Sequence, residues 1–240
     1  KVLTGEKGFS ASTIKTLEKK HIVYILLSCI TLVSCSLYEL DNQEPPKSEV
    51  YGNLVYNGQV VPVKNGQIPL NFYQDSYKGN GNFQVMPSQD GKINALLFDG
   101  EYKIILASNQ GAYEENATPY ILNVKGKTEL NWEITPFFFV NKATYNCANK
   151  QITAKVDISK ISQNRDLEFV SIIVSKSIIC DRINKEKEFI LNASDISNLS
   201  DIHITGDLSN WKNDYFFVRI GVKSVGNTFY NYSQVQRIEL

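Results

Sequence analysis

The stretch TELNWEIT, residues 128–135, alternates apolar and polar side chains with a period of two. Leu130, Trp132 and Ile134 fall on one face of such a segment, and their polar neighbours fall on the other. This period is typical of a β-strand with one buried face. We therefore expect a strand here, with Trp132 in a hydrophobic core.

The same alternation recurs further along the chain. Residues 152–158 alternate Ile, Ala and Val with Thr, Lys and Asp, and residues 215–223 place Phe216 and three aliphatic residues opposite Arg219. Short turn signals such as Asn57-Gly58 separate the apolar runs. No stretch keeps a helical period of 3.6 residues. The sequence therefore predicts an all-β fold of two tandem antiparallel β-sandwich domains.

Composition is ordinary for a globular protein. The chain has 240 residues, 42% hydrophobic and 21% charged, which is long enough for two modest domains. A boundary is expected near Thr135-Pro136, giving domains at 50–135 and 136–240. The formal net charge is zero, so nothing points to a nucleic-acid partner.

An export signal precedes these domains. Two lysines lead into IVYILLSCITLV, residues 22–33, an apolar run that is shorter than the roughly 20 residues a membrane span needs. Such a run behind basic residues predicts a signal peptide, with residues 1–34 as leader. LVSC, residues 32–35, resembles the bacterial lipobox, in which the cysteine, here Cys35, is lipidated. The alternatives are an ordinary secretory peptide or an N-terminal anchor helix.

Residues 35–49 then carry the lipidated cysteine and a polar segment that includes Pro45-Pro46. We expect a flexible tether to a membrane partner. Acidic residues such as Glu39 and Asp41 are similar to the surface-export signal of Bacteroidetes lipoproteins. The predicted location is the outer membrane, exposed at the cell surface, with the periplasmic leaflet as the open alternative.

Two cysteines lie in the predicted second domain, Cys147 and Cys180. An oxidising compartment permits a disulfide between them, and two buried free thiols are the alternative. No CxxC or HxxxH spacing supports zinc. We expect no metal and no cofactor.

Four short motifs resemble a known family. LFDGEY, residues 97–102, resembles the FDGxY strand-turn-strand of transthyretin-like and carboxypeptidase-regulatory-like β-sandwiches. ITPFF at 134–138, RIGVK at 219–223 and YSQVQ at 232–236 are similar to a Bacteroidetes lipoprotein family of unknown function.

That family is encoded beside SusC/SusD-type outer-membrane glycan-uptake receptors. The resemblance implies a transthyretin-like first domain, an immunoglobulin-like second domain and a role in polysaccharide capture at the cell surface. It brings no catalytic residues. A glycan and SusC/SusD-type receptors are the partners it implies.

Carbohydrate binding needs exposed aromatic rings and nearby polar groups. SNWKND, residues 209–214, is too polar for a strand interior, so Trp211 is the leading candidate ring. The alternative is a hydrophobic plug at the edge of the domain. Further candidates are the polar neighbours and two tyrosines of predicted loops: Asn210, Asn213, Asp214, Tyr77 and Tyr113.

Catalytic signals are weak. His203 is the only histidine after Cys35, and alternation places it on the exposed face of a strand, away from a catalytic role. Acidic pairs such as Glu114-Glu115 are expected in solvated loops. A calcium site at Asp207 and Asp214 would need six or more oxygens.

Three functions follow from these patterns. The first is a non-catalytic surface lipoprotein that assists polysaccharide binding and uptake. The second is a structural or adhesive surface module that binds a protein partner. The third is a glycosidase-like enzyme. We expect the first of these, a binding protein that is not an enzyme.

Overall fold

The computed structural model describes residues 44–74 and 81–240, and residues 46–240 form one compact unit. Within the described ranges the chain is built from strands β1 to β16 and one 3-10 turn, η2 (Ala193–Asp195). No helix of this part is long and apolar enough to cross a membrane. The predicted leader, Cys35 and Tyr77 lie outside the described residues.

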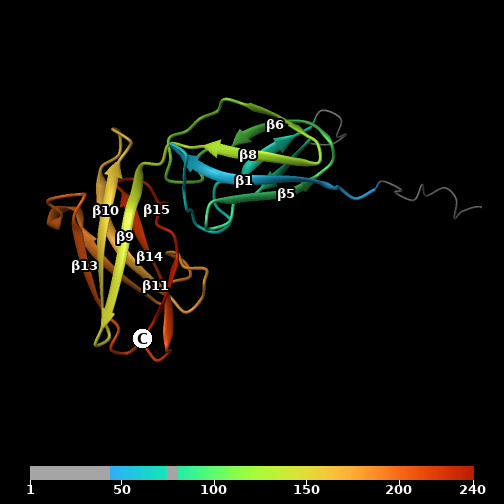
Figure 1. Cartoon of the computed structure of the whole chain (residues 1–240). Coiled ribbons are helices and arrows are strands. Elements are labelled where there is room, and N and C mark those ends of the chain that lie inside the picture. Colours follow the sequence, from blue (N-terminus) through green and yellow to red (C-terminus); the bar gives the residue numbers. More distant parts are fainter. Residues whose placement is uncertain (1–43, 75–80) are drawn as a thin grey trace, which may run out of the picture. The chain divides into compact units, whose positions relative to one another are not determined.

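Two four-stranded sheets form the first domain, and Figure 1 shows β1 beside β5 and β8 in one of them. That sheet contains β1 (Ser48–Tyr56), β2 (Gln59–Val60), β5 (Lys92–Leu97) and β8 (Lys127–Glu133). The other contains β3 (Leu70–Tyr73), β4 (Asn82–Val85), β6 (Gly100–Leu106) and β7 (Tyr120–Val124). Both sheets contribute to one buried core, which includes Leu54, Phe72, Ile104 and Trp132.

Local sequence explains these strands. Trp132 is only 8% exposed, as the alternation of β8 predicts. Asn57 and Gly58 join β1 to β2 with φ angles of 48° and 73°. Positive φ at both central residues is the signature of the tight hairpin turn that Asn-Gly favours. The predicted hairpin is confirmed.

One pairing departs from the prediction of purely antiparallel sheets. β1 and β8 run parallel, with Leu54 opposite Trp132. Parallel neighbours need a long crossover, and residues 57–126 supply it. Gly52 lies where the two strands approach closest, because a Cβ there would be 2.0 Å from the Leu130 carbonyl oxygen. A period-two alternation predicts a strand, but it does not predict whether the neighbouring strand runs parallel or antiparallel to it.

The FDGxY segment behaves as the resemblance implies. Gly100 opens β6 with φ 146°, in a region that favours glycine. Tyr102 packs back into the core at 1% exposure, and its hydroxyl donates to the Phe98 carbonyl over 3.0 Å. The motif thus closes the β5–β6 connection.

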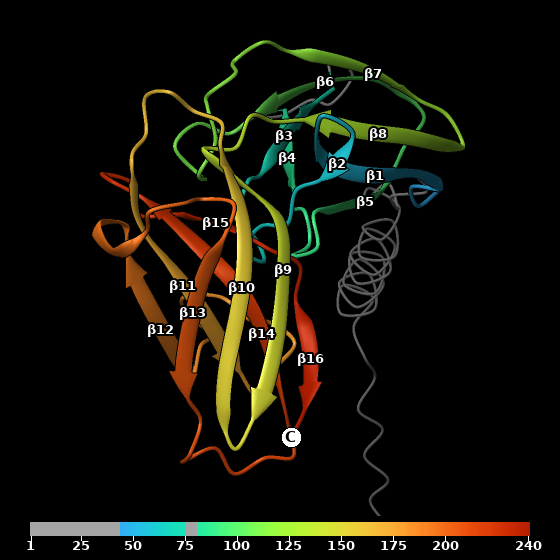
Figure 2. The same ribbon diagram turned by 60° about the vertical axis from the view of Figure 1, so that its left-hand side comes forward.

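Two further sheets form the second domain. One contains β9 (Phe138–Ala148), β10 (Gln151–Lys160) and β13 (Ile202–Asp207). The other contains β11 (Leu167–Ser175), β12 (Lys187–Asn192), β14 (Tyr215–Ser224), β15 (Tyr230–Tyr232) and β16 (Gln236–Glu239). Figure 2 shows the first of these sheets in front of β11 and β14, and one cluster of buried side chains lies between the two layers.

The strand β14 is buried on both faces. Phe216, Val218 and Ile220 are fully buried in the core, as the alternation predicts. Arg219, on the opposite face, is also 0% exposed, because its guanidinium donates to the Val63 carbonyl of the first domain over 2.9 Å. A contact between distant segments therefore decides the environment of this arginine.

Candidate functional site

A polar cavity of about 400 Å³ opens where loops of the two domains meet, and we call it the junction cavity. The first domain contributes residues of the β6–β7 connection. The second contributes the residue before β9, the β10–β11 connection and the β14–β15 connection. The lining residues are Asn109, Gly111, Tyr113, Glu114, Glu115, Phe137, Arg165, Gly226, Asn227, Thr228 and Phe229.

Two neighbouring carboxylates of the cavity are held by the chain around them. The Glu114 N–H donates to the Thr135 carbonyl over 2.8 Å, and the Glu114 carboxylate accepts a short hydrogen bond from the Ser162 hydroxyl. The Glu115 carboxylate accepts the Asn109 N–H over 2.9 Å. Each of these bonds uses one oxygen, so each carboxylate keeps an acceptor oxygen for a ligand.

Arg165 supplies donors to the same cavity. Its guanidinium carbon lies 4.8 Å from the centroid of the Phe137 ring. In the described part of the chain no hydrogen bond or ion pair engages this guanidinium, so its N–H groups remain available. This contact with a buried ring positions the guanidinium without consuming its donors.

Asn227 shapes the opposite wall. Its side-chain NH₂ donates to the Gly111 carbonyl over 3.4 Å, and its side-chain oxygen accepts the Phe229 N–H over 2.7 Å. Phe229 is partly exposed and packs against the second core. The cavity therefore combines acceptors, donors and one partly exposed aromatic ring.

Tyr113 lies at this cavity in a different role from the one predicted. The ring is 3% exposed, and its hydroxyl donates to the Ala107 carbonyl. Burial raises the pKa of Tyr113 to about 12, and the Glu115 carboxylate adds to the rise. Tyr113 lies in a loop, as expected, but Gly111 to Tyr113 are buried, so the ring is not open to a ligand. Tyr113 forms a wall of the cavity.

Buried polar contacts hold the two sides of the cavity together. Asn231 is 8% exposed; its side-chain oxygen accepts the Phe138 N–H over 3.0 Å, and its NH₂ donates to the Ala112 carbonyl over 2.8 Å. Among residues that do not line the cavity, Gln89 of the first domain donates to the Ile178 carbonyl of the second over 2.6 Å. Asn231 thus links the loop of the first domain to β9 and β15.

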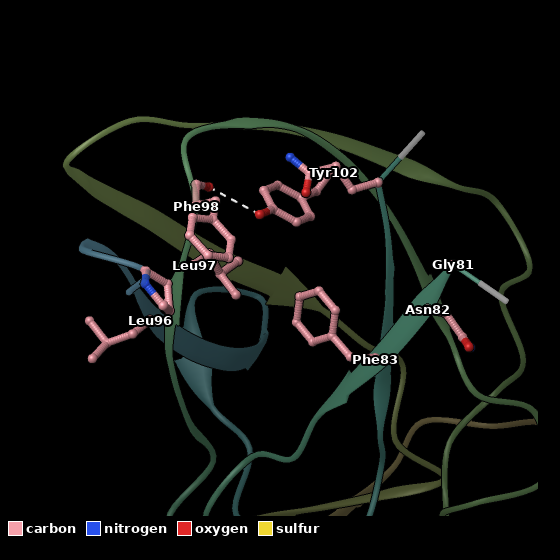
Figure 3. A pocket seen from close by; sticks show the side chains of 9 residues that line it. Gly81, Asn82, Phe83, Leu96, Leu97, Phe98 and Tyr102 are labelled. Atoms are coloured by element: carbon pink, nitrogen blue, oxygen red, sulfur yellow. Dashed lines mark hydrogen bonds between the residues drawn. The ribbon is translucent and has the colours of Figure 1, made fainter. Parts of the chain in front are cut away.

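A second cavity, of about 290 Å³, lies within the first domain, and we call it the end cavity. Figure 3 shows Phe83, Phe98 and Tyr102 around it. Phe83 is 41% exposed and Phe98 is 44% exposed. The remaining lining residues are Pro46, Gln74, Gly81, Asn82, Leu96 and Leu97. Its wall is mainly apolar, unlike that of the junction cavity.

The predicted ring Trp211 is buried. It is 5% exposed, belongs to the second core and donates its indole N–H to the Tyr215 carbonyl over 3.0 Å. Its ring meets Phe216 edge-on with centroids 6.0 Å apart. No face of this ring is open to a sugar, so placing the ligand at Trp211 is corrected here. The alternative of a hydrophobic plug describes it.

The polar neighbours of Trp211 stay near the surface. Asn210 and Asp214 are exposed and Asn213 is half-buried, and none of them lines the junction cavity. His203 is exposed on β13, as predicted, and lies 3.1 Å from the Asp201 carboxylate. Sequence patterns missed Arg165, Asn227 and Phe229, since each lies in an ordinary loop and only the fold brings them together.

Both cysteines of the second domain are free thiols, Cys147 half-buried and Cys180 buried. Burial raises the pKa of Cys180 to about 12, so this thiol stays protonated. Across the described ranges, no group of three or more His, Cys, Asp and Glu side chains is placed to hold a metal ion.

Comparison with known proteins begins with solved structures. A DUF3823 family protein from Parabacteroides merdae is 27% identical, with 82% of this chain and 100% of that chain covered and a TM-score of 0.74. One from Bacteroides ovatus is 29% identical, with coverages of 81% and 100% and a TM-score of 0.75.

A third similar structure, from Bacteroides uniformis, is described as a candidate carbohydrate binding protein. It is 16% identical, covers 81% of this chain and 100% of its own, and has a TM-score of 0.66, so it shows the fold alone. Among curated proteins none matches this chain.

Two family models match in tandem. The N-terminal domain of the protein of unknown function DUF3823 matches residues 48–135, and the DUF3823 C-terminal domain of unknown function matches residues 138–237. Together they account for most of the chain and leave only a short connection between them. The chain therefore belongs to the DUF3823 family and carries both of its domains.

Proposed function

We propose that this protein is a non-catalytic surface lipoprotein that binds polysaccharide as an accessory to glycan uptake, and that the junction cavity contacts the sugar. The observation that carries the proposal is the convergence of Glu115, Arg165 and Phe229 on one cavity. Sugar hydroxyls both donate and accept hydrogen bonds, and apolar sugar faces pack on aromatic rings. The Bacteroides uniformis structure described as a candidate carbohydrate binding protein shares this fold, which supports the proposal of sugar binding.

The remaining parts of the proposal concern fold type and location. We assign a transthyretin-like fold to the first domain and an immunoglobulin-like fold to the second. Cys35 is the lipidation site that anchors the protein in the outer membrane, facing outward. SusC/SusD-type receptors are its neighbours there. The lipobox LVSC and the acidic residues after it support this assignment.

Affinity gel electrophoresis tests sugar binding with the full chain in detergent. Neutral and acidic polysaccharides are included in the gel, and retardation is measured. Glu115→Gln and Arg165→Gln each remove a charge-assisted hydrogen bond, which is worth about 1.5–3 kcal/mol or about ten- to hundredfold in affinity. Glu101→Gln, at an exposed position of β6, is the matched control and should migrate as the parent does. If no polysaccharide in the gel retards the protein, the proposal is wrong.

Metabolic labelling tests the anchor. Cells expressing the chain are supplied with labelled palmitate, and incorporation is compared between the parent and Cys35→Ser. We expect label in the parent alone, because the thiol is the only nucleophile of LVSC that lipidation uses. Label that persists in Cys35→Ser would contradict the assignment.

A second candidate function rests on the end cavity. Phe83, Leu96 and Phe98 are 41%, 63% and 44% exposed at or beside it, and exposed apolar side chains that lie close together are typical of protein interfaces. Chemical crosslinking in cells compares the parent with Phe98→Ser. Loss of a specific crosslinked receptor in Phe98→Ser, without any glycan retardation of the parent, would favour a structural or adhesive module.

Catalysis is tested on the same polysaccharides by measuring new reducing ends. We expect none, because the proposed function assigns the free oxygens of Glu114 and Glu115 to hydrogen bonds with sugar hydroxyls. Turnover that disappears in Glu114→Gln would instead support the glycosidase-like alternative.

A further inference from the structure

The charges of the junction cavity say which class of glycan it takes. The charged residues that line it are two carboxylates, Glu114 and Glu115, and one guanidinium, Arg165. The lining therefore carries one more negative than positive charge. Arg182, nearby, is not a lining residue; its guanidinium donates to the Thr228 carbonyl and lies 5.6 Å from the centroid of the Tyr230 ring.

Ion pairs outside the cavity leave this balance unchanged. Asp166, next to Arg165 in sequence, pairs with Lys160 over 2.8 Å, so the two charges cancel. The Lys160 ammonium also holds the pKa of Asp166 below its usual range. The two carboxylates of the cavity thus have one lining cation, Arg165, to offset them, and Arg182 borders the cavity through Thr228.

The hydrogen-bonding groups of the cavity also favour a neutral ligand. The free oxygens of Glu114 and Glu115 accept and cannot donate, so they need hydroxyl donors from a ligand. Arg165 only donates, so it needs an acceptor oxygen. A neutral sugar ring offers both on adjacent carbons, whereas a uronate or sulfate brings acceptors and negative charge against two carboxylates.

Resting on the proposed function, we propose that the junction cavity takes neutral sugar residues and discriminates against acidic ones. Glu115 accepts from one hydroxyl, Arg165 donates to another, and the partly exposed face of Phe229 packs on the apolar side of the ring. The two carboxylates act as the selective element, because an anionic ligand is repelled where a neutral one gains hydrogen bonds.

The test measures affinity of the full chain in detergent for three polymers: a neutral galactomannan, polygalacturonate and chitosan. We expect the galactomannan to bind best. Its affinity should change less than about twofold between about 0.05 M and 0.5 M salt, because a neutral ligand has no charge to screen. Preference for polygalacturonate or for chitosan would overturn the inference while leaving the proposed function standing.

The sign of the Glu115→Gln effect gives a second, independent readout. For a neutral ligand the substitution should weaken binding about tenfold, because a neutral hydrogen bond replaces a charge-assisted one. For an acidic ligand it should strengthen binding, because repulsion is removed. Arg165→Gln should weaken galactomannan binding by a similar factor, and Arg237→Gln, on β16, is the matched control.

The outcomes separate the inference from the proposed function. Galactomannan binding that neither Glu115→Gln nor Arg165→Gln weakens would overturn the placement in this cavity. Polygalacturonate binding by the parent that Glu115→Gln weakens would overturn the class of ligand. Failure of all three polymers to bind would instead remove the proposed function.

Discussion

The loop at residues 209–214 and the junction cavity carry the same kinds of side chain and arrange them in opposite ways. In the loop, the Trp211 ring turns into the second core and its amides and carboxylate remain near the surface. In the junction cavity, loops that are distant in sequence bring carboxylates, a guanidinium and a partly exposed ring to one hollow.

The difference shows what residue type alone cannot supply. A polar segment around an aromatic residue is equally suited to a ligand site and to a loop that seals a core. Concavity decides between them, because a ligand must be contacted from several sides to bind. At the junction that concavity exists because two domains contribute walls to it. Three experiments test this contrast.

The largest expected effect concerns the loop at residues 209–214, whose Trp211 ring is buried in the second core. Trp211→Ala should lower the free energy of unfolding by about 3–5 kcal/mol, since it removes a large buried ring and leaves a cavity. Urea denaturation followed by circular dichroism measures the loss. The folded fraction should keep its glycan affinity in gels. A stable Trp211→Ala protein that no longer binds glycan would reverse the roles assigned to the two regions.

A smaller loss is expected where the junction is held together. Asn231→Leu leaves the Phe138 N–H buried without a partner and leaves the Ala112 carbonyl with the Phe137 N–H as its donor, which should cost about 1–3 kcal/mol. Because Ala112 lies between the lining residues Gly111 and Tyr113, glycan affinity should fall as well. Asn210→Leu, in the exposed loop, is the matched control and should stay within about 0.5 kcal/mol. Equal effects of the two substitutions would show that the junction is not built through Asn231.

The smallest effect concerns Tyr113, whose pKa burial raises to about 12. The folded protein holds this proton more tightly than the unfolded chain does. Its contribution to stability is therefore complete below pH about 10 and is lost as the pH rises toward about 12. Unfolding midpoints in urea at pH 8 and pH 11 should differ less in Tyr113→Phe than in the parent. Tyr51→Phe, on an exposed part of β1, should follow the parent, and a Tyr113→Phe profile identical to the parent would refute this account.

Strands were predictable to the extent that one face of each is buried and the other is not. β8, β10 and β13 follow their alternation residue by residue, and Asn57-Gly58 forms the turn that its dihedral preferences demand. Prediction from the local sequence fails where both faces of a strand are buried. Arg219 is fully buried although its strand presents it as the polar face, because the first domain packs over it.

The candidate site was predictable only in fragments. The sequence predicts Glu114-Glu115 as a carboxylate pair in a solvated loop and Tyr113 as a candidate ring in a loop. Both lie at the junction cavity. Arg165 and Phe229, about sixty residues apart in the sequence, carry no local signal that joins them to that pair.

The amino-acid sequence by itself determined that the chain is all-β, which segments are strands and where the tight turns fall, because period-two burial and turn dihedrals are local properties. Tertiary structure alone decided that β1 and β8 pair in parallel, that Trp211 is sealed in a core and that Glu115, Arg165 and Phe229 share a cavity. Those outcomes depend on contacts between residues far apart in the chain, whose free energy no local pattern records.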